Sequence, residues 1–444
     1  MKYCIIGGDA AGMSAAMQIV RRDPEATITV FERGDIYSYG QCGLPYTVSG
    51  LIPSTDDLIA RSVATFRDRY HIDARTCHEV RSIDSEEKKV VGVHTKTGEA
   101  FFHSYDKLLI ASGASPVMPE WEGNHLPGIH TIKTIPDTNR LINDLTSAVR
   151  EVVIIGGGYI GLEMAENLHA LGKNVTIIQR GNHLGNMFDE DMAQSIHDEA
   201  KKHGISVYLQ EEVKRFKGHD RVQFVKTNKR DVPADLVIVA VGITPNVSFL
   251  KNNDIHLHDN GAILVNHYME TNLEDIYAAG DCATQYHLVK EMDDYIPLGT
   301  HANKQGRIAG INMAGGHQTF KGVVGSSIVK FMDLALGKTG INEREANELQ
   351  FSVEAITTEA KDIAGYYPDA KPLTVKLLYN KSNQRLLGGQ IIGYHGVDKR
   401  VDVLATALYN KMDFHELEDL DLCYAPPFNS VWDPIQQVAR RAKN

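Results

Sequence analysis

The sequence predicts an α/β protein with two Rossmann-like nucleotide-binding domains and an α+β C-terminal domain. Two strand–glycine–helix units carry this prediction, one beginning at Tyr3 and the other at Glu151. Each unit has an apolar strand, a glycine-rich turn, an amphipathic helix and a second β-branched strand, which is the order of a dinucleotide-binding βαβ unit. From residue 323 the glycine-rich patterns give way to alternating strands, which is typical of an α+β domain.

Length and composition indicate a large folded protein. The 444 residues suffice for two or three domains, and the hydrophobic content of 43% allows sizeable cores. A net charge of −11 disfavours nucleic acid or an anionic membrane as a partner. No apolar run approaches the roughly 18 residues of a membrane span. The cysteines are scattered and odd in number, so we expect a reduced, cytoplasmic protein, and we expect no metal site.

The first unit reads KYCIIGGDAAGMSAAMQIVRRDPEATITVFERG. Gly7 allows the tight turn after the strand, and Gly12 lets helix and strand pack closely. The helix N-terminus directs free N–H groups at a pyrophosphate. Glu32 stands where an acid accepts hydrogen bonds from ribose hydroxyls. Asp9 replaces the middle glycine of the fingerprint, so a tight turn without a ligand is the alternative.

The second unit reads EVVIIGGGYIGLEMAENLHALGKNVTIIQRG. Gly156, Gly158 and Gly161 match the full glycine fingerprint. Gln179 and Arg180 stand where an acid would be expected. An acid would repel a 2′-phosphate, whereas an arginine can bind one. We therefore expect a nicotinamide site that accepts NADPH, and an exposed surface charge is the alternative for Arg180.

Two nucleotide units in one chain indicate a flavin that receives electrons from a nicotinamide. The segment TNLEDIYAAGDCA places an apolar strand before Asp281, in the position of an acid that accepts from the ribitol of FAD. YDKLLIASGASP and ADLVIVAVGITPN each join an apolar strand to a glycine, Gly113 and Gly242 respectively, and a nearby proline. We expect these two segments to be the crossings between the nucleotide domains and to contact FAD and NAD(P).

With these motifs the chain resembles the pyridine nucleotide–disulfide oxidoreductases along its full length. It is most similar to their single-cysteine branch, which contains coenzyme A-disulfide reductase, NADH oxidase and NADH peroxidase. The resemblance implies an FAD domain of residues 1–112 and 245–322 and an NAD(P) domain of residues 113–244. It also implies a C-terminal domain, residues 323–444, that forms a homodimer and completes the partner's active site.

The stretch YSYGQCGLPYTVSG contains the one cysteine of this branch, Cys42, with no second cysteine nearby. A single thiol can hold an external disulfide or an oxygen, so the sulfur cycles through a mixed disulfide or a sulfenic acid. Oxidase and peroxidase members carry a histidine in the first glycine loop, where this sequence has Ala10. That difference argues against peroxide chemistry.

Two tyrosines match the places where coenzyme A-disulfide reductases bring active-site tyrosines from the partner subunit. They are Tyr366 in AGYYPDAKPL and Tyr424 in LCYAPPFNSVWDP. A tyrosine hydroxyl can donate a proton to a departing thiolate. Packing at the dimer interface is the alternative, and Tyr367 competes with Tyr366 for the same role.

The resemblance also implies contacts to coenzyme A (CoA), whose phosphates need basic partners. The implied CoA contacts are Gln18, Arg21, Arg22, Ser38, Gln41, Asn303, Lys304 and Arg307. Solvated helix charges are the alternative for the basic ones. Tyr159 and Glu163 are implied beside the stacked nicotinamide and flavin, although Glu163 also suits a first-turn acid favoured by the helix dipole.

The sequence thus predicts a homodimeric FAD-dependent oxidoreductase that reduces CoA disulfide with NADPH or NADH. CoA is expected to be bound covalently to Cys42 as a mixed disulfide. The alternatives are a water-forming NADH oxidase, a persulfide or polysulfide reductase and, from another class, a flavoprotein redox sensor that does not use the thiol. Relatives that reduce polysulfide often carry a further rhodanese-like domain, which is not expected within these residues.

Overall fold

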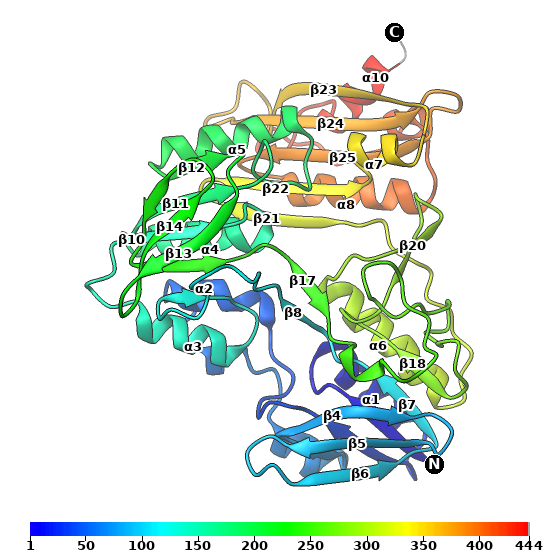
Figure 1. Cartoon of the computed structure of the whole chain (residues 1–444). Helices are drawn as coiled ribbons and strands as arrows, with labels where there is room; N and C mark the ends of the chain where they lie inside the picture. Colours follow the sequence, from blue (N-terminus) through cyan, green and yellow to red (C-terminus); the bar gives the residue numbers. More distant parts are fainter. Residues whose placement is uncertain (443–444) are drawn as a thin grey trace.

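Three five-stranded sheets organise the protein, and the computed structural model describes residues 1–442 (Figure 1). In the first sheet all neighbouring strands are parallel, in the order β18 (Ile276–Ala278), β7 (Lys107–Ile110), β1 (Lys2–Ile6), β2 (Thr27–Phe31) and β3 (Asp73–Arg75). Apart from their first residues, β1 and β2 are buried throughout. Continuous apolar runs of this kind suit a parallel sheet that is covered on both faces.

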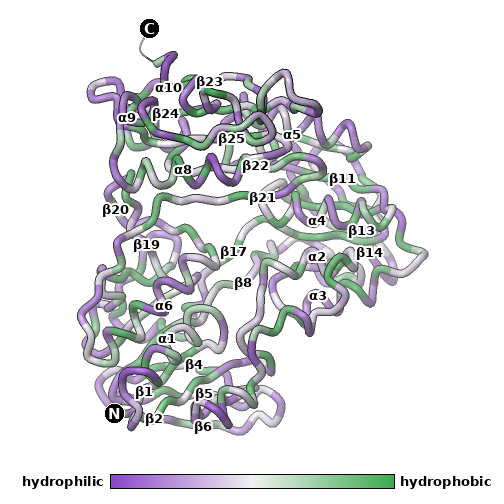
Figure 2. Tube along the Cα trace, turned by 180° about the vertical axis from the view of Figure 1, so that it is seen from behind, coloured by the Kyte–Doolittle hydropathy of each residue, from purple (hydrophilic) through white to green (hydrophobic). Residues whose placement is uncertain are grey.

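Helices α1 (Ala10–Arg22) and α6 (Gly299–Met313) lie side by side next to the first sheet, as both views show (Figures 1 and 2). Their backbones approach closely because α6 has glycines at the contact. A Cβ atom on Gly306 would lie 2.1 Å from the carbonyl oxygen of Ala11, and one on Gly310 would lie 2.4 Å from that of Ala15. Helix α1 ends at Arg22, directly before Asp23 and Pro24, because a residue that precedes proline disfavours the helical conformation.

The second sheet is also parallel, in the order β12 (Ser206–Leu209), β11 (Asn174–Gln179), β10 (Glu151–Ile155), β16 (Leu236–Val239) and β9 (Ile129–His130). Helices α3 (Ile135–Asp144), α4 (Tyr159–Ala170) and α5 (Glu190–Lys202) lie in the part of the chain that forms this second sheet. Helix α4 ends just before Gly172, whose φ of +71° is the left-handed conformation favoured after a helix.

The third sheet is antiparallel, in the order β21 (Ser327–Phe331), β22 (Leu334–Gly340), β25 (Leu386–Gly393), β24 (Pro372–Asn380) and β23 (Val353–Lys361). The accompanying helices are α7 (Glu343–Glu348), α8 (Val397–Tyr409), α9 (Phe414–Glu418) and α10 (Pro434–Arg441). The segment LLGGQIIG forms β25, and all of its residues are buried.

Smaller sheets join these parts. The pair β8 (Ala114–Pro116) and β17 (Ile243–Pro245) is antiparallel. The two strands directly follow Gly113 and Gly242, the glycines of the expected crossings. The others are β4 (His78–Asp84) with β5 (Lys89–His94) and β6 (Ala100–Ser104), β13 (Val213–Gly218) with β14 (Val222–Thr227) and β15 (Asp231–Pro233), and β19 (Gln285–His287) with β20 (Met292–Asp294).

The mixed α/β class predicted from the sequence is confirmed, with two parallel sheets before an antiparallel one. The expected domain boundaries at residues 112, 244 and 322 stay predictions. Within residues 1–442, none of the helices is both long and apolar enough to cross a bilayer.

Candidate functional site

Cys42 lies in a short 3₁₀ turn, Gln41–Gly43, directly before helix α2 (Leu44–Val48). Two hydrogen bonds fasten this turn to the start of α1. The backbone N–H of Tyr39 donates to Asp9 Oδ1 at 3.1 Å, and Gln41 Nε2 donates to Asp9 Oδ2 at 2.6 Å. Asp9 therefore departs from the glycine fingerprint because its carboxylate holds the Cys42 turn in place. The Gln41 amide is used in this contact, so its expected role toward CoA stays a prediction.

The thiol of Cys42 is exposed, but the surrounding protein does not favour its ionised form. Desolvation raises the pKa of Cys42, and the negative charge of Glu163 raises it further, while the Lys133 ammonium lowers it. Lys133 Nζ also donates to Asp281 Oδ2 at 2.9 Å, which leaves the other oxygen of that carboxylate available. The sequence analysis missed Lys133, because an isolated lysine in a connecting segment carries no motif.

Glu163 connects the second nucleotide unit to the Cys42 turn. It lies on α4, and Tyr46 Oη of α2 donates to Glu163 Oε1 at 3.5 Å. Burial raises the pKa of Glu163 to about 7, against the lowering effect of that hydrogen bond. The neighbouring Tyr159 hydroxyl is hydrogen-bonded to Ser327 Oγ at the start of the third sheet. Both residues that the resemblance implied beside the cofactors thus lie at contacts between separate parts of the chain.

A cleft of about 410 Å³ runs between α1, α6 and the segment before Cys42. It is lined by Ala10, Met13, Ser14, Met17, Gln18, Arg21, Ser38, Arg61, Phe66, Asn303, Lys304 and Arg307. Most of the expected CoA contacts therefore come together here. Arg22 and Gln41 are not among the lining residues. Arg61 was missed by the sequence analysis, because its loop approaches α1 only in the folded chain.

The cleft is cationic although the protein as a whole is acidic. Its lining includes Arg21, Arg61, Lys304 and Arg307 but no carboxylate. Within the described part of the chain, none of these four side chains is in an ion pair, and the Arg61 guanidinium lies over the ring of Tyr70 at 5.7 Å. Unpaired cations that share one cleft suit an anionic ligand with several charges.

The first glycine loop fits a dinucleotide. A Cβ atom on Gly7 would lie 2.1 Å from the carbonyl oxygen of Ala111, and one on Gly12 would lie 2.0 Å from that of Gly7. Both glycines are therefore required for the turn itself. Glu32 Oε2 accepts from the Gly8 N–H at 3.0 Å, so its carboxylate stands at the loop with lone pairs for ribose hydroxyls.

The second glycine loop has the same construction with one chemical difference. Gly156 and Gly161 are packed against backbone in the same way as Gly7 and Gly12, whereas a Cβ on Gly158 would meet no atom closer than 3.9 Å. Gln179 Oε1 accepts from the Gly157 N–H at 3.0 Å, which is the contact that Glu32 makes in the first unit. The remaining group of Gln179 is an N–H donor, and the following Arg180 is exposed.

The remaining expected glycines lie in the crossings. Gly113 has φ +66° and Gly242 has φ +126°, and no atom would contact a Cβ at either position. The chain is therefore bent there by backbone conformation and leaves open space, as the approach of a cofactor requires. Their contacts to FAD and NAD(P) stay predictions.

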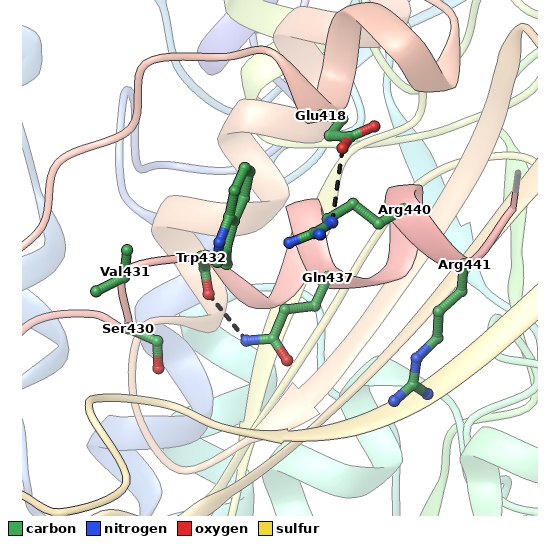
Figure 3. Close-up of a pocket in the computed structure, with 7 residues that line it drawn as sticks. All are labelled: Glu418, Ser430, Val431, Trp432, Gln437, Arg440 and Arg441. Atoms are coloured by element: carbon green, nitrogen blue, oxygen red, sulfur yellow. Dashed lines mark hydrogen bonds and ion pairs between the residues drawn. The ribbon is translucent and has the colours of Figure 1, made fainter.

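The two expected tyrosines meet on the surface of the C-terminal part. Tyr366 Oη and Tyr424 Oη are hydrogen-bonded at 3.0 Å, and the side chains are 77% and 45% exposed. A separate hollow of about 760 Å³ is lined by Glu418 and by residues from Ser430 to Arg441 (Figure 3). In it Arg440 lies over the Trp432 ring at 4.3 Å and pairs with Glu418. This hollow contains the ion pair of Arg440 with Glu418, unlike the cationic cleft, whose four cations are in no ion pair within the described residues.

Comparison with known proteins agrees with these features. Residues 1–306 match the family described as pyridine nucleotide-disulphide oxidoreductase, and residues 326–434 match the dimerisation domain of that family. A Pyrococcus abyssi protein named NAD(P)H sulfur oxidoreductase (CoA-dependent) is 39% identical over 99% of this chain and 97% of its own length. A Staphylococcus aureus protein named coenzyme A disulfide reductase is 34% identical over the full length of both chains. The solved NAD-dependent persulfide reductase from A. fulgidus has a TM-score of 0.97 at 37% identity and covers all of this chain and 83% of its own.

Proposed function

Because the chain belongs to the pyridine nucleotide–disulphide oxidoreductases, we propose that it is an FAD-dependent enzyme that reduces CoA disulfide with NAD(P)H through Cys42. The overall reaction converts CoA disulfide, NAD(P)H and a proton into two CoA thiols and NAD(P)⁺. The family implies both nucleotides, and the two glycine loops have the construction that they need. We infer a homodimer from the dimerisation domain, and a reducing compartment such as the cytoplasm suits the free Cys42 thiol.

The cationic cleft is the observation that carries this proposal. It lies along one face of α1, with lining residues from Ala10 to Arg21. At 1.5 Å per residue this face is about 16 Å long, which suits an extended pantetheine arm. Since Asp9 ties the Cys42 turn to the start of this face, the thiol end of CoA points to Cys42 and the phosphates to Arg21 at the other end. Lys304 and Arg307 line the cleft from α6, beside the first turns of α1.

The residues of the chain supply the thiol chemistry. The Cys42 thiolate attacks one sulfur of CoA disulfide, a Cys42–CoA disulfide forms, and the first CoA leaves as a thiolate that accepts a proton. Tyr366 and Tyr424 are exposed on the surface of the dimerisation domain. We therefore infer that this hydroxyl pair reaches the partner's cleft and donates that proton. Two electrons and a proton then release the second CoA thiol and restore Cys42. The Lys133 ammonium stabilises the Cys42 thiolate in each catalytic cycle.

The nucleotides divide between the two glycine loops. When bound, FAD would supply the redox chemistry that links NAD(P)H to the Cys42 sulfur. Gly7, Gly12, Glu32, Gly113 and Asp281 are the residues that would hold it. Gly156, Gly158, Gly161, Gln179 and Gly242 would hold NAD(P)H, and the donors of Gln179 and Arg180 favour a nucleotide with a 2′-phosphate.

A CoA-bound persulfide or polysulfide is the second candidate substrate, because relatives with 37–39% identity carry such names. The cationic cleft would bind CoA in either case. A rhodanese-like domain is not a criterion that separates the candidates, since the sulfur oxidoreductase of Pyrococcus abyssi is matched over 97% of its length.

Intact-mass measurement of the purified protein tests the proposal. We expect part of the protein to carry one CoA that dithiothreitol releases, and we expect Cys42→Ser to remove the adduct. Cys423→Ser, a change at the other exposed cysteine, should retain it. Turnover is then compared among CoA disulfide, CoA persulfide and oxygen at equal NADPH. Fast oxygen consumption without any CoA substrate, or undiminished turnover of Cys42→Ser, would refute the proposal.

A further inference from the structure

A buried arginine lies beneath the two exposed tyrosines. Arg400 is on α8 and is 1% exposed. By residue volume it is the largest fully buried side chain in the described part of the chain. Its Nε donates to both carboxylate oxygens of Asp433, at 2.9 and 3.2 Å, and Asp433 is also buried. Burial of an ion pair carries a desolvation cost, so such a pair points to a specific structural requirement at this place.

The Nη2 group of Arg400 connects the segments that carry the tyrosines, whereas Nη1 donates to the carbonyl oxygen of Gly396 at 3.1 Å. Nη2 donates to the carbonyl oxygen of Asp362 at 2.9 Å, four residues before Tyr366. The same nitrogen donates to Asn429 Oδ1 at 3.1 Å, and Asn429 Nδ2 donates to the carbonyl oxygen of Cys423, the residue before Tyr424. One guanidinium therefore determines the position of both segments at their bases.

Direct contacts between the segments are few. The Ala364 N–H donates to the Pro426 carbonyl oxygen at 3.2 Å, and Ser430 Oγ donates to that of Ile363 at 3.4 Å. Both are at the long end of the range for hydrogen bonds. The Arg400 contacts to Asp362 and Asn429, at 2.9 and 3.1 Å, are shorter than these direct contacts between the segments.

We propose that Arg400 is a positioning residue for the proton-donating tyrosine pair, because its fork of donors fixes Tyr366 and Tyr424 at hydrogen-bond distance on the surface that meets the partner's Cys42. The inference rests on the proposed function. A planar guanidinium is needed for this purpose, because it bonds Asp433, Asp362 and Asn429 in different directions at once, and an ammonium cannot match that geometry.

The test combines Arg400→Lys with the double variant Tyr366→Phe/Tyr424→Phe in the FAD-loaded dimer. In the wild-type background we expect Arg400→Lys to lower kcat with CoA disulfide about 10- to 100-fold, since a misplacement of about 1 Å at a reacting group has effects of this size. The rate of FAD reduction by NADPH, measured in the same samples, should stay within about twofold of wild type. In the double-phenylalanine background Arg400→Lys should change kcat less than about twofold, because the pair on which it acts is gone.

Two further variants keep the test decisive. Asn429→Ala removes one contact of the Arg400 network and should show the same pattern with a smaller loss of kcat. It can therefore replace Arg400→Lys in the test if that variant does not fold. Arg441→Lys is the matched control, because Arg441 is in the same part of the chain and bonds Thr358 instead of either tyrosine segment. Equal losses from Arg400→Lys or Asn429→Ala in both tyrosine backgrounds would overturn the inference. A wild-type enzyme without turnover on CoA disulfide would overturn the proposed function itself.

Discussion

The hydroxyl groups of Tyr366 and Tyr424 are hydrogen-bonded to each other at 3.0 Å although 58 residues separate them in sequence. Both side chains are exposed, so the pair is built for contact with something outside this chain. The hydrogen bond to Tyr424 raises the pKa of Tyr366. Two adjacent hydroxyl groups on the surface of a dimerisation domain have the chemistry of the proposed proton donor to the leaving thiolate in the partner's cleft.

Replacement of the hydroxyls tests this role. We expect Tyr424→Phe to lower kcat for CoA disulfide about 100-fold, the usual scale of general acid catalysis, and Tyr366→Phe to lower it less. Steady-state rates with saturating NADPH measure the change. Tyr409→Phe is a fitting control, since Tyr409 is an exposed tyrosine of α8 outside the pair. Losses in the control as large as in the pair would contradict the role.

The charge of the cationic cleft should determine substrate affinity. Arg61→Gln removes a cation that has no ion-pair partner, and we expect KM for CoA disulfide to rise about fivefold while kcat stays constant, as the loss of about 1 kcal/mol of binding implies. The salt dependence of KM should weaken as well. Arg69→Gln, a change at a nearby exposed arginine that does not line the cleft, should leave KM unchanged. A constant KM in Arg61→Gln would show that CoA binds elsewhere.

Glu163 should govern the ionisation of Cys42. The pKa of Glu163 is about 7, so above neutral pH its negative charge raises the pKa of the thiol, and below neutral pH the protonated acid has a smaller effect. Glu163→Gln removes the charge, and we expect the rate of Cys42 alkylation to reach its plateau at lower pH than in wild type. Mass spectrometry of the alkylated peptide measures this profile. Glu120→Gln, a change at an exposed glutamate, serves as the control. An alkylation profile of Glu163→Gln identical to that of wild type would exclude the coupling between Glu163 and Cys42.

The nucleotide preference should follow from the donors of the second glycine loop. We expect Arg180→Ala to lower kcat/KM for NADPH about tenfold or more, the value of one charge-assisted hydrogen bond, while NADH is little affected. Gln179→Glu should shift the preference to NADH by repulsion of the 2′-phosphate. The ratio of the two kcat/KM values measures both effects. Lys201→Ala on α5 is the control, and a ratio unaffected by Arg180→Ala would place the 2′-phosphate elsewhere.

Much of the fold could be predicted because it is specified locally. The order of strand, helix and second strand in the two nucleotide units could be predicted, since β-branched and apolar runs between turn residues define them. Gly7, Gly12, Gly156 and Gly161 could be identified because their positions allow no side chain. Asp9 was a departure from the motif in sequence alone, and its partner, the Cys42 turn, lies about 30 residues away.

By itself the sequence determined the two nucleotide units, the isolated Cys42 and the positions of the two tyrosines, because each depends on spacing within a short segment. The tertiary structure alone decided which charges meet. It brought Arg61 into a cleft with Arg21 and Arg307, placed Lys133 and Glu163 beside Cys42 with opposite effects on its pKa, and set Arg400 beneath the tyrosine pair. Electrostatic and hydrogen-bond contacts of this kind act over a few ångströms in space, and residues far apart in sequence come within that range only after the chain has folded.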